Sequence, residues 1–416
     1  MPVSTTRARM KPPTPIVTSL VGLLTVTVAV GASAQDWPQW RGAQRDAKAP
    51  GFKAPEVWPK ELTQARKVAV GDGDSTPALA GGKLYVFTRQ EGVEIVRCLD
   101  AGSGKELWQA SYDALGATGP ASRHAGPRSS PTVADGKVLT YGVRGILSCF
   151  EAETGKLLWR RDDFPGVWPR FFTASSPVVT DGLVIAQLGG EENGGVVAYA
   201  LASGAQKWKW TGDGVAYASP VLVSLGGSRA VVSLTARKIV VIGAADGQLL
   251  WEAPFVAQRR AYNAATPIVD GQKIIYAGAG RGAKAVKLES SGSTLSATEL
   301  WSNPDHGPQF NSPVLVSGRL YGVSQAGDLF CLDAQEGKTL WSAQVGGGGF
   351  GSVVAAGSFL LALTPQGDLV VFAPGDKEYK PLASYKVGTD TYAYPIPAGN
   401  GIYVKDKESV TLWTLN

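Results

Sequence analysis

Short runs of alternating or wholly apolar residues, separated by turns rich in Gly and Asp, follow one another along the chain from about residue 60 to its end. Runs of roughly four to eight residues bounded by Gly, Asp, Asn and Pro are typical of β-strands. No segment after residue 34 requires a helix to explain its pattern. The pattern therefore predicts an all-β protein.

One unit recurs along the chain at a spacing of roughly 40 to 54 residues, which is typical of repeat architectures. Each unit opens with a segment that usually has Ser or Thr before Pro, holds four short runs separated by turns, and usually closes on Leu-Trp. Four antiparallel strands per unit are typical of the blades of a β-propeller, in which each blade packs against two neighbours. The opening segments, which predict an eight-bladed β-propeller of four-stranded antiparallel blades, start at Ser75, Ser129, Ser175, Ala218, Ala265, Asn311, Gly351 and Tyr394.

The two ends of the repeat region complement each other. The last unit ends at Asn416 one strand short, whereas Glu61–Val70 precedes the first unit as a strand without a unit of its own. We expect this N-terminal strand to complete the last blade, because that arrangement removes both exposed sheet edges and closes the ring. The predicted organisation is an extension over residues 35–60 followed by one propeller domain over residues 61–416.

Residues 1–34 have the three parts of a secretory signal peptide: a basic start, an apolar run over residues 16–30 and an Ala-Ser-Ala site ending at Ala34. A run of about 15 apolar residues is short of the roughly 20 that span a bilayer. Gln35 stands where a lipid anchor would need a cysteine. We therefore expect cleavage after Ala34 and a periplasmic or secreted bacterial protein that does not span the membrane.

Charge and rare residues exclude several classes of function. The chain has 40 Lys and Arg against 35 Asp and Glu; removing the three basic residues of the first 15 leaves a near-neutral protein, so no nucleic-acid binding is expected. Two histidines in the chain leave little for a zinc site. Cys98, Cys149 and Cys331 occupy equivalent places in separate repeats, so we expect buried thiols without disulfides. No metal site is predicted.

The closing strings LDAGSGKELW, FEAETGKLLW and LDAQEGKTLW resemble the PQQ-type (pyrroloquinoline-quinone-type) propeller repeat. This repeat is found in quinoprotein dehydrogenases and in the propeller lipoprotein of the bacterial outer-membrane barrel-assembly machine. The resemblance covers nearly all of residues 60–416 and implies the propeller fold. It also implies that the tryptophan closing each outer strand docks on the neighbouring blade. The residues that take this role here are Trp108, Trp159, Trp208, Trp251, Trp301 and Trp341.

The resemblance to quinoprotein dehydrogenases is incomplete. Those enzymes combine the blades with a vicinal cysteine pair, a calcium-binding set and often a haem domain, and this sequence has neither adjacent cysteines nor a C-x-x-C-H haem motif. We therefore expect no cofactor, with PQQ and calcium as the alternative.

Candidate binding residues gather on one face of the predicted ring. Because successive strands reverse direction, the turns between second and third strands share a face with the loops that connect one blade to the next. Arginines and aromatic rings at this channel mouth suit an anionic or polar planar partner. The alternative is that they are ordinary loop residues, with some arginines paired to nearby aspartates. The candidates are Arg123, His124, Arg128, Arg144, Arg170, Tyr217, Arg237, Arg259, Tyr262, Asn263, Arg281, His306, Asn311 and Tyr392.

Two functions from different classes remain open. The first is a non-enzymatic, monomeric binding or scaffold module that holds a protein, peptide, glycan or anionic small ligand in the basic, aromatic funnel, with no catalytic residue assigned. The second is a PQQ-dependent or quinone-linked dehydrogenase that acts on alcohols or sugars. A carbohydrate hydrolase or lyase would depend on His124 or His306, the two histidines of the chain.

Overall fold

The structure, a computed structural model, describes residues 1–4, 36–258, 261–291, 294–345 and 350–415. Most of the predicted signal peptide and the candidate residue Arg259 lie outside the described residues. The chain divides into two units, residues 1–31 and 32–416, and every element below belongs to the second.

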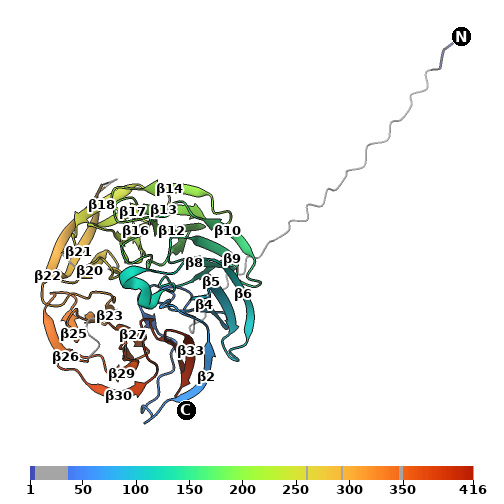
Figure 1. Cartoon of the computed structure of the whole chain (residues 1–416). Helices are drawn as coiled ribbons and strands as arrows, with labels where there is room; N and C mark the ends of the chain where they lie inside the picture. The colour runs from blue at the N-terminus through green and yellow to red at the C-terminus, as the bar shows by residue number, and fades with distance from the viewer. Residues whose placement is uncertain (5–35, 259–260, 292–293, 346–349, 416) are drawn as a thin grey trace. The chain divides into compact units, whose positions relative to one another are not determined.

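The described residues form eight antiparallel blades around a central channel (Figure 1). Chain order within a blade runs from the channel outward, so that its first strand is innermost. The first blade contains β3 (Ala78–Ala80), β4 (Lys83–Gln90), β5 (Val93–Asp100) and β6 (Glu106–Asp113). The second contains β7 (Thr132–Ala134), β8 (Lys137–Tyr141), β9 (Leu147–Glu151) and β10 (Leu157–Arg161). The third contains β11 (Val178–Thr180), β12 (Leu183–Leu188), β13 (Gly195–Ala200) and β14 (Gln206–Trp210).

The remaining blades repeat this order. The fourth contains β15 (Val221–Leu225), β16 (Ser228–Leu234), β17 (Lys238–Gly243) and β18 (Leu249–Pro254). The fifth contains β19 (Ile268–Asp270), β20 (Lys273–Gly278), β21 (Gly282–Ser291) and β22 (Thr294–Asn303). The sixth contains β23 (Val314–Val316), β24 (Arg319–Val323), β25 (Asp328–Asp333) and β26 (Thr339–Gln344). The seventh contains β27 (Ser352–Ala356), β28 (Phe359–Leu363), β29 (Asp368–Phe372) and β30 (Pro381–Lys386).

The eighth blade closes the ring with a strand from the other end of the chain. It contains β31 (Ile396–Ala398), β32 (Gly401–Lys405), β33 (Ser409–Thr414) and, outermost, β2 (Thr63–Ala69). β2 pairs with β33 antiparallel, with Thr63 opposite Thr414 and Ala69 opposite Ser409. The predicted eight-bladed fold and its closure by the N-terminal strand are confirmed.

One short helical turn departs from the all-strand expectation. The 3₁₀ helix η1 (Gly119–His124) lies in the loop between β6 and β7 and is the coiled ribbon near the middle of the ring (Figure 1). Pro120 stands in its first turn, where a residue without an N–H loses no helical hydrogen bond.

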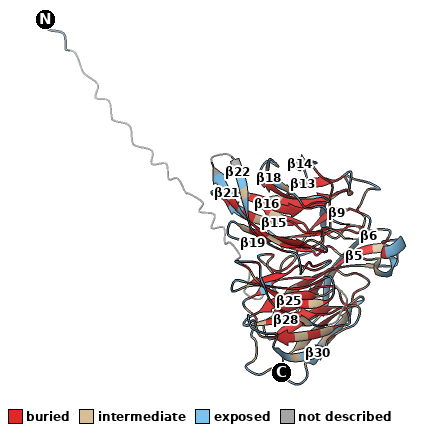
Figure 2. Cartoon of the chain, turned by 90° about the vertical axis from the view of Figure 1, so that its left-hand side faces the viewer, coloured by how far each residue is buried: buried red, intermediate tan, exposed pale blue. Residues whose placement is uncertain are grey.

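Burial follows from the packing of each blade against two others. The second and third strands are buried on both faces, and in β8 the four residues after Lys137 are all buried. In the outer strand β10, by contrast, Leu157 and Leu158 are exposed. Buried segments accordingly fill the interior of the blades, and exposed segments lie at turns and outer edges (Figure 2). The three cysteines are buried and free, as predicted, and each lies on the third strand of its blade.

Tryptophans on the outer strands fasten each blade to the next. Trp159 of β10 donates from Nε1 to the carbonyl oxygen of Leu201 in the third blade at 2.9 Å. Its indole lies against Gly204, where an added Cβ would stand 2.7 Å from Trp159 Cδ2. Trp251 packs against buried residues of the fourth and fifth blades. The equivalent bonds, each of 3.0 Å, join Trp108 to Ala152, Trp208 to Ala244, Trp301 to Ala334 and Trp341 to Gly375.

Hydroxyl groups of the opening segments also link neighbouring blades near the inner strands, again from one blade to the next along the chain. The backbone N–H of Ser130 donates to Ser176 Oγ, and the N–H of Ser176 donates to Ser219 Oγ, both at 2.9 Å. Thr266 N donates to Ser312 Oγ at 2.8 Å. The Ser or Thr before Pro therefore has a structural role, because its hydroxyl accepts the N–H that the neighbouring inner strand cannot pair within its own sheet.

Residues 36–53, here called the plug, fill the channel from the face opposite the blade-connecting loops. Both ends of the plug lie at turns between first and second strands: Gly81 N donates to Asp36 Oδ1 at 3.2 Å, and Lys53 N donates to Gly399 O at 2.7 Å. Within the plug, β1 (Lys48–Ala49) runs parallel to β27. The plug therefore enters the ring, turns inside it and leaves on the same face.

Two buried arginines hold the plug to the sixth and third blades. Arg41 donates to the carbonyl oxygens of Ser312 and Pro313 at 2.7 and 2.6 Å. Arg45 donates to the carbonyl oxygens of Ser176 and Pro177 at 3.0 and 2.9 Å. Burial, together with the charge of Arg41, lowers the pKa of Arg45 to about 9. The channel is thus closed from below by a segment that the sequence analysis treats only as an N-terminal extension.

Candidate functional site

A cavity of about 360 Å³ opens at the mouth of the channel, on the side of the blade-connecting loops. Its floor includes Trp40 of the plug, whose ring meets that of Tyr394 edge-on at 4.8 Å and whose Nε1 donates to Thr266 Oγ1 at 2.9 Å. Because the plug fills the channel beneath it, this cavity is closed at the bottom and is reached from the loop face.

Aromatic rings surround much of the mouth. Phe310 and Phe350 stack with centroids 4.7 Å apart and planes 15° apart. Phe350 in turn meets Tyr392 edge-on at 5.3 Å, and Tyr392 meets His124 at 4.8 Å. On the other side of Phe310, the chain of rings continues through Tyr262 to Tyr217 and Phe171.

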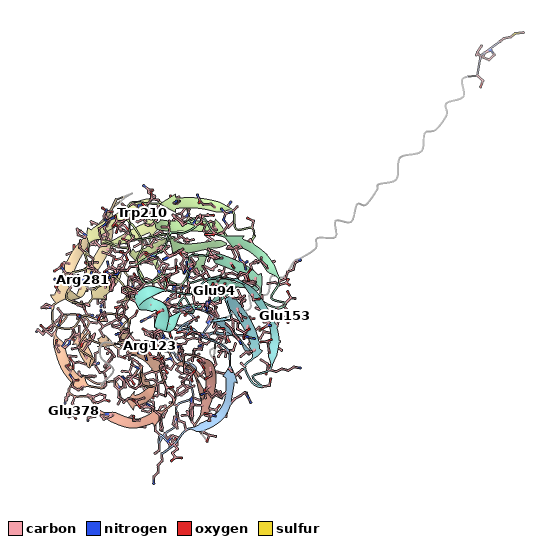
Figure 3. All side chains as sticks on the ribbon, viewed as in Figure 1. Glu94, Arg123, Glu153, Trp210, Arg281 and Glu378 are labelled. Atoms are coloured by element: carbon pink, nitrogen blue, oxygen red, sulfur yellow. The ribbon has the colours of Figure 1, made fainter. Side chains whose placement is uncertain are left out.

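One sector of the cavity wall is polar. His124 Nδ1 lies 3.1 Å from Asp74 Oδ1, and His124 Nε2 lies 3.8 Å from Asp390 Oδ1. Asp390 also pairs with Arg123, the side chain of which is 75% exposed. In the view along the channel, Arg123 lies near the centre of the ring (Figure 3). The imidazole is therefore held between two carboxylates at the rim.

Arg128 carries the positive charge of the same sector into the cavity. Its Nη2 donates to the carbonyl oxygen of His124 at 2.7 Å and lies 3.5 Å from that of Ala121. Burial lowers the pKa of Arg128 from its ordinary value, although Asp74 and Asp72 partly offset this effect. Among the described residues, the buried Nη1 has no hydrogen-bond partner. Backbone carbonyl oxygens thus fix the orientation of the guanidinium.

The sequence-predicted candidates divide by position. His124, Arg128, Tyr217 and Tyr392 line the cavity. Tyr262 contacts the rings of the wall, and Arg123 contributes the ion pair at the rim. These are the candidates that the fold brings together at the mouth.

Three candidate arginines brace the connecting loops instead. Arg144, Arg237 and Arg281 lie in turns between second and third strands, and each bonds to the loop that precedes its blade. Arg144 donates to Gly116 O at 3.0 Å, and Arg281 donates to Asn263 Oδ1 at 2.6 Å. None of the three is among the described residues lining the cavity, because these turns lie farther from the axis than the connecting loops do.

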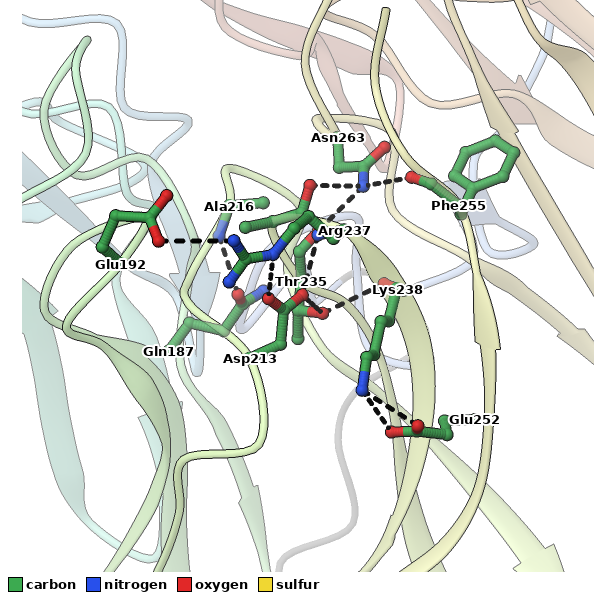
Figure 4. Close-up of polar contacts among 11 residues, drawn as sticks. Gln187, Glu192, Asp213, Ala216, Thr235, Arg237, Lys238, Glu252, Phe255 and Asn263 are labelled. Atoms are coloured by element: carbon green, nitrogen blue, oxygen red, sulfur yellow. Dashed lines mark hydrogen bonds and ion pairs between the residues drawn. The ribbon is translucent and has the colours of Figure 1, made fainter.

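The brace of the fourth blade contains ion pairs. Arg237 Nε donates to Asp213 Oδ1 at 2.8 Å, and its Nη1 lies 3.3 Å from Glu192 Oε2 (Figure 4). Asp213 also accepts from Thr235 Oγ1 and from the backbone N–H of Arg237, each at 2.7 Å. Burial alone would raise the pKa of Asp213, but these hydrogen bonds and the guanidinium charge hold it below its ordinary value.

The other candidates have local partners. Asn263 and Asn311 are buried, and their side-chain amides donate to the backbone oxygens of Thr235 and Val323. The ring of His306 stacks on Phe330 at 5.1 Å, and burial lowers its pKa. Arg170 is exposed, with its guanidinium 5.6 Å from the ring centre of Phe171.

Several cavity residues were not among the predicted candidates, and a positional signal could have found six of them. The residue directly before each opening segment lines the cavity in all eight blades. This position lies near the axis on the loop face, because the innermost strand of the blade starts two to four residues after it. Trp40 has no such signal, since it belongs to the plug. The eight equivalent residues are Asp74, Arg128, Ala174, Tyr217, Ala264, Phe310, Phe350 and Ala393.

Comparisons with known proteins agree with this fold. The family described as "Outer membrane protein assembly factor BamB" matches residues 92–343 and 289–416. BamB from Yersinia pestis is 25% identical over 309 residues, which are 70% of this chain and 71% of that protein. The quinohemoprotein alcohol dehydrogenase ADH IIB of Pseudomonas putida is 40% identical, but over 95 residues, 21% of this chain and 12% of that enzyme.

Solved structures share the architecture at low sequence identity. BamB from Moraxella catarrhalis superposes with a TM-score of 0.60 at 16% identity, covering 85% of this chain and 97% of that one. The quinohemoprotein alcohol dehydrogenase of Comamonas testosteroni superposes with a TM-score of 0.66 at 15% identity, covering 92% and 80%. At such identities the likeness concerns the fold. The family match, in contrast, extends from residue 92 to residue 416, and this protein therefore belongs to the PQQ-repeat propeller family of the outer membrane protein assembly factor BamB.

Proposed function

We propose that this protein is an exported scaffold of the bacterial envelope that binds a protein or peptide segment of a partner at the mouth of its channel. The relatives with the longest matches reported above are outer membrane protein assembly factors, which supports a protein partner and an envelope location. Among the described residues, no helix is both long and apolar enough to cross a membrane.

One observation carries the proposal: a chain of aromatic rings surrounds an open cavity that has a closed floor. A closed floor is unsuited to passing a substrate through the ring, whereas rings on connecting loops are suited to anchoring a partner's side chains. Phe310, at the centre of that chain of rings, is 41% exposed. An exposed aromatic ring beside other rings is a favourable anchor, because binding removes its apolar surface from water.

The test compares partner capture by two double variants. One removes exposed rings at the mouth, and the other removes exposed apolar side chains on the outer strands. Tyr262→Ala with Phe310→Ala should abolish enrichment of outer-membrane assembly components from envelope extract, measured by quantitative mass spectrometry. The matched control is Leu107→Ala with Leu249→Ala, which removes exposed side chains from the outer strands β6 and β18. Equal enrichment by both double variants and the unaltered protein would refute the proposed site.

The second candidate function is a PQQ-linked dehydrogenase, favoured by the 40% identity of one segment to a quinohemoprotein enzyme. Calcium needs about six to eight oxygen ligands. The described residues contain no group of three or more His, Cys, Asp or Glu side chains placed to hold a metal ion. Of the described residues lining the cavity, Asp74 is the one acid, and it is paired with His124. The acidic side chains at the cavity therefore do not fit the binding of PQQ with calcium.

Titration decides between the two functions. The purified protein is mixed with PQQ and calcium, and its absorbance spectrum is recorded before dye reduction is followed with a panel of alcohols and sugars. The scaffold proposal expects neither a spectral change nor turnover. Saturable binding of PQQ together with dye reduction would establish the dehydrogenase instead.

A further inference from the structure

The cavity is built from eight equivalent positions whose side chains differ. In the first two blades the residue before the opening segment is charged, Asp74 and Arg128. In the fourth, sixth and seventh blades it is aromatic, and in the third, fifth and eighth it is alanine. The repeat would make these positions alike if they served only to close the ring. Their difference instead gives the cavity a polar sector and an aromatic sector.

The two sectors face each other across the axis. The second and sixth blades are four apart in a ring of eight, so Arg128 enters the cavity opposite Phe310. Phe350 stacks on Phe310 and extends the aromatic side, while the alanines leave space between the sectors. A molecule that reaches from one sector to the other therefore needs a polar group at one end and a flat apolar body at the other.

The charge of Arg128 defines the polar group. Arg128 lines the cavity, and none of the ion pairs among the described residues includes its guanidinium. A cation without a paired carboxylate favours an acceptor-rich anion, and a carboxylate is the group that suits a guanidinium best.

Asp74, the acid beside Arg128, does not form an ion pair with its guanidinium. Asp74 contacts His124 Nδ1 at 3.1 Å, and Asp390 is engaged by Arg123 at 3.3 Å. Arg128 is itself held in place by the carbonyl oxygen of His124. The guanidinium is thus prearranged, which lowers the entropic cost of fixing it on a ligand.

The volume limits the body of the ligand. A cavity of about 360 Å³ corresponds to roughly twelve water molecules at about 30 Å³ each. A cavity of this volume accommodates one or two fused aromatic rings with a short acidic arm.

We infer that this cavity binds a small aryl monocarboxylate, with the carboxylate on Arg128 and the ring against Phe310 and Phe350. The inference goes beyond the scaffold role. Both proposals use the ring of Phe310, but the carboxylate on Arg128 belongs to the small ligand alone. Variants of Arg128 therefore test the ligand without testing the scaffold.

Isothermal titration with matched probes tests the inference. Phenylacetate, indole-3-acetate and 2-naphthoate are each compared with the corresponding amide, which keeps the ring and removes the charge. At least one acid should bind with a Kd below about 1 mM, and its amide at least tenfold more weakly. No binding by any acid, equal binding of acid and amide, or tighter binding of PQQ than of every monoacid would overturn the inference.

Variants of Arg128 and of an arginine outside the mouth locate the site. Arg128→Gln should lower the affinity for the acid to that for the amide, and Arg128→Lys should retain part of the preference for the acid. Arg229→Gln is the control, because Arg229 pairs with Asp181 at the surface and is not among the described residues lining the cavity; it should change the affinity less than twofold. An unchanged affinity in a folded Arg128→Gln protein would refute the assignment.

A measurement on the unaltered protein guards against a variant that fails to fold. A ligand that binds only the folded state raises the melting temperature in proportion to the logarithm of its concentration above Kd. The acid should raise the melting temperature of the unaltered protein progressively, and the amide should not. Equal shifts with acid and amide would contradict the role of the carboxylate.

Discussion

Arg41 Nη1 donates to the carbonyl oxygen of Ser312 at 2.7 Å, which joins the plug to the sixth blade across 271 residues of sequence. The same guanidinium reaches Pro313 O at 2.6 Å, and Arg41 is buried. The plug is therefore an integral part of the ring.

Replacing Arg41 by Ala should lower the free energy of unfolding by roughly 3 kcal/mol, because two buried carbonyl groups lose a charged donor. Urea denaturation of the purified protein measures this loss. Arg319→Ala is the control, since Arg319 pairs with Asp376 at the surface and should cost less than about 1 kcal/mol. Equal losses in the two variants would show that the plug contributes little to stability.

Two glycines of similar backbone conformation test the docking of the tryptophans. Gly204 has a φ of +69° and lies under the indole of Trp159, whereas Gly182 has a φ of +72° and has nothing within 4 Å of an added Cβ. Ala at either position incurs the left-handed strain of roughly 1 kcal/mol. Gly204→Ala should cost about 2 kcal/mol more than Gly182→Ala, because the blades must also separate. Comparable unfolding free energies for both variants would mean that the indole of Trp159 can move away from residue 204 without a measurable cost.

The fold could be predicted from sequence because the signals for it are local and repeated. Each blade repeats one pattern of strands and turns, and an unpaired strand at Glu61–Val70 matched a missing strand before Asn416. Strand pairing follows from such patterns, since sheets leave few edges unpaired. The buried thiols Cys98, Cys149 and Cys331 followed from their equivalent places in the repeat.

The plug could not be predicted, because its contacts leave no pattern. Arg41 and Arg45 bond to backbone oxygens, and every residue type supplies such oxygens. The site residues could be predicted in part. The sequence indicates the face of the ring on which Arg144 and Arg281 lie, but it does not indicate their distance from the axis. That distance decides whether an arginine reaches the cavity or braces a loop.

Lys405 should give stability an unusual dependence on pH. Its Nζ is buried among carbonyl oxygens, including Gly73 O at 2.8 Å and Asp406 O at 2.7 Å, and burial lowers its pKa to about 8. The unfolded chain, with a pKa of about 10.4, therefore binds more protons than the folded one between these values. The contribution of Lys405 to stability rises with pH across this window.

The expected size of this effect is about 3 kcal/mol, from roughly 2.5 pKa units at 1.36 kcal/mol each. Unfolding free energies at pH 7.5 and 10.5 should show this difference between the unaltered protein and Lys405→Met. Lys377→Met, which changes an exposed lysine, should leave the pH dependence as it is. A Lys405→Met protein with the same slope as the unaltered one would contradict a lowered pKa.

Arg237→Gln should separate the bracing of loops from the binding of ligand. Asp213 is nearly inaccessible to solvent and would lose its charged partner. The cost should be about 1 to 2 kcal/mol, less than for a fully buried pair, because Arg237 is half exposed and water screens its charge.

The variant should also change the behaviour in acid. The lowered pKa of Asp213 contributes stability above the unfolded value near 3.9, and this stability is lost as pH falls through the folded value. With Gln at position 237 the pKa of Asp213 rises, so that the loss begins at higher pH, as acid-unfolding curves should show. Affinity for an aryl carboxylate should stay within twofold, since Arg237 is not among the described residues of the cavity wall. A tenfold loss of affinity in a folded Arg237→Gln protein would indicate that Arg237 takes part in binding the ligand.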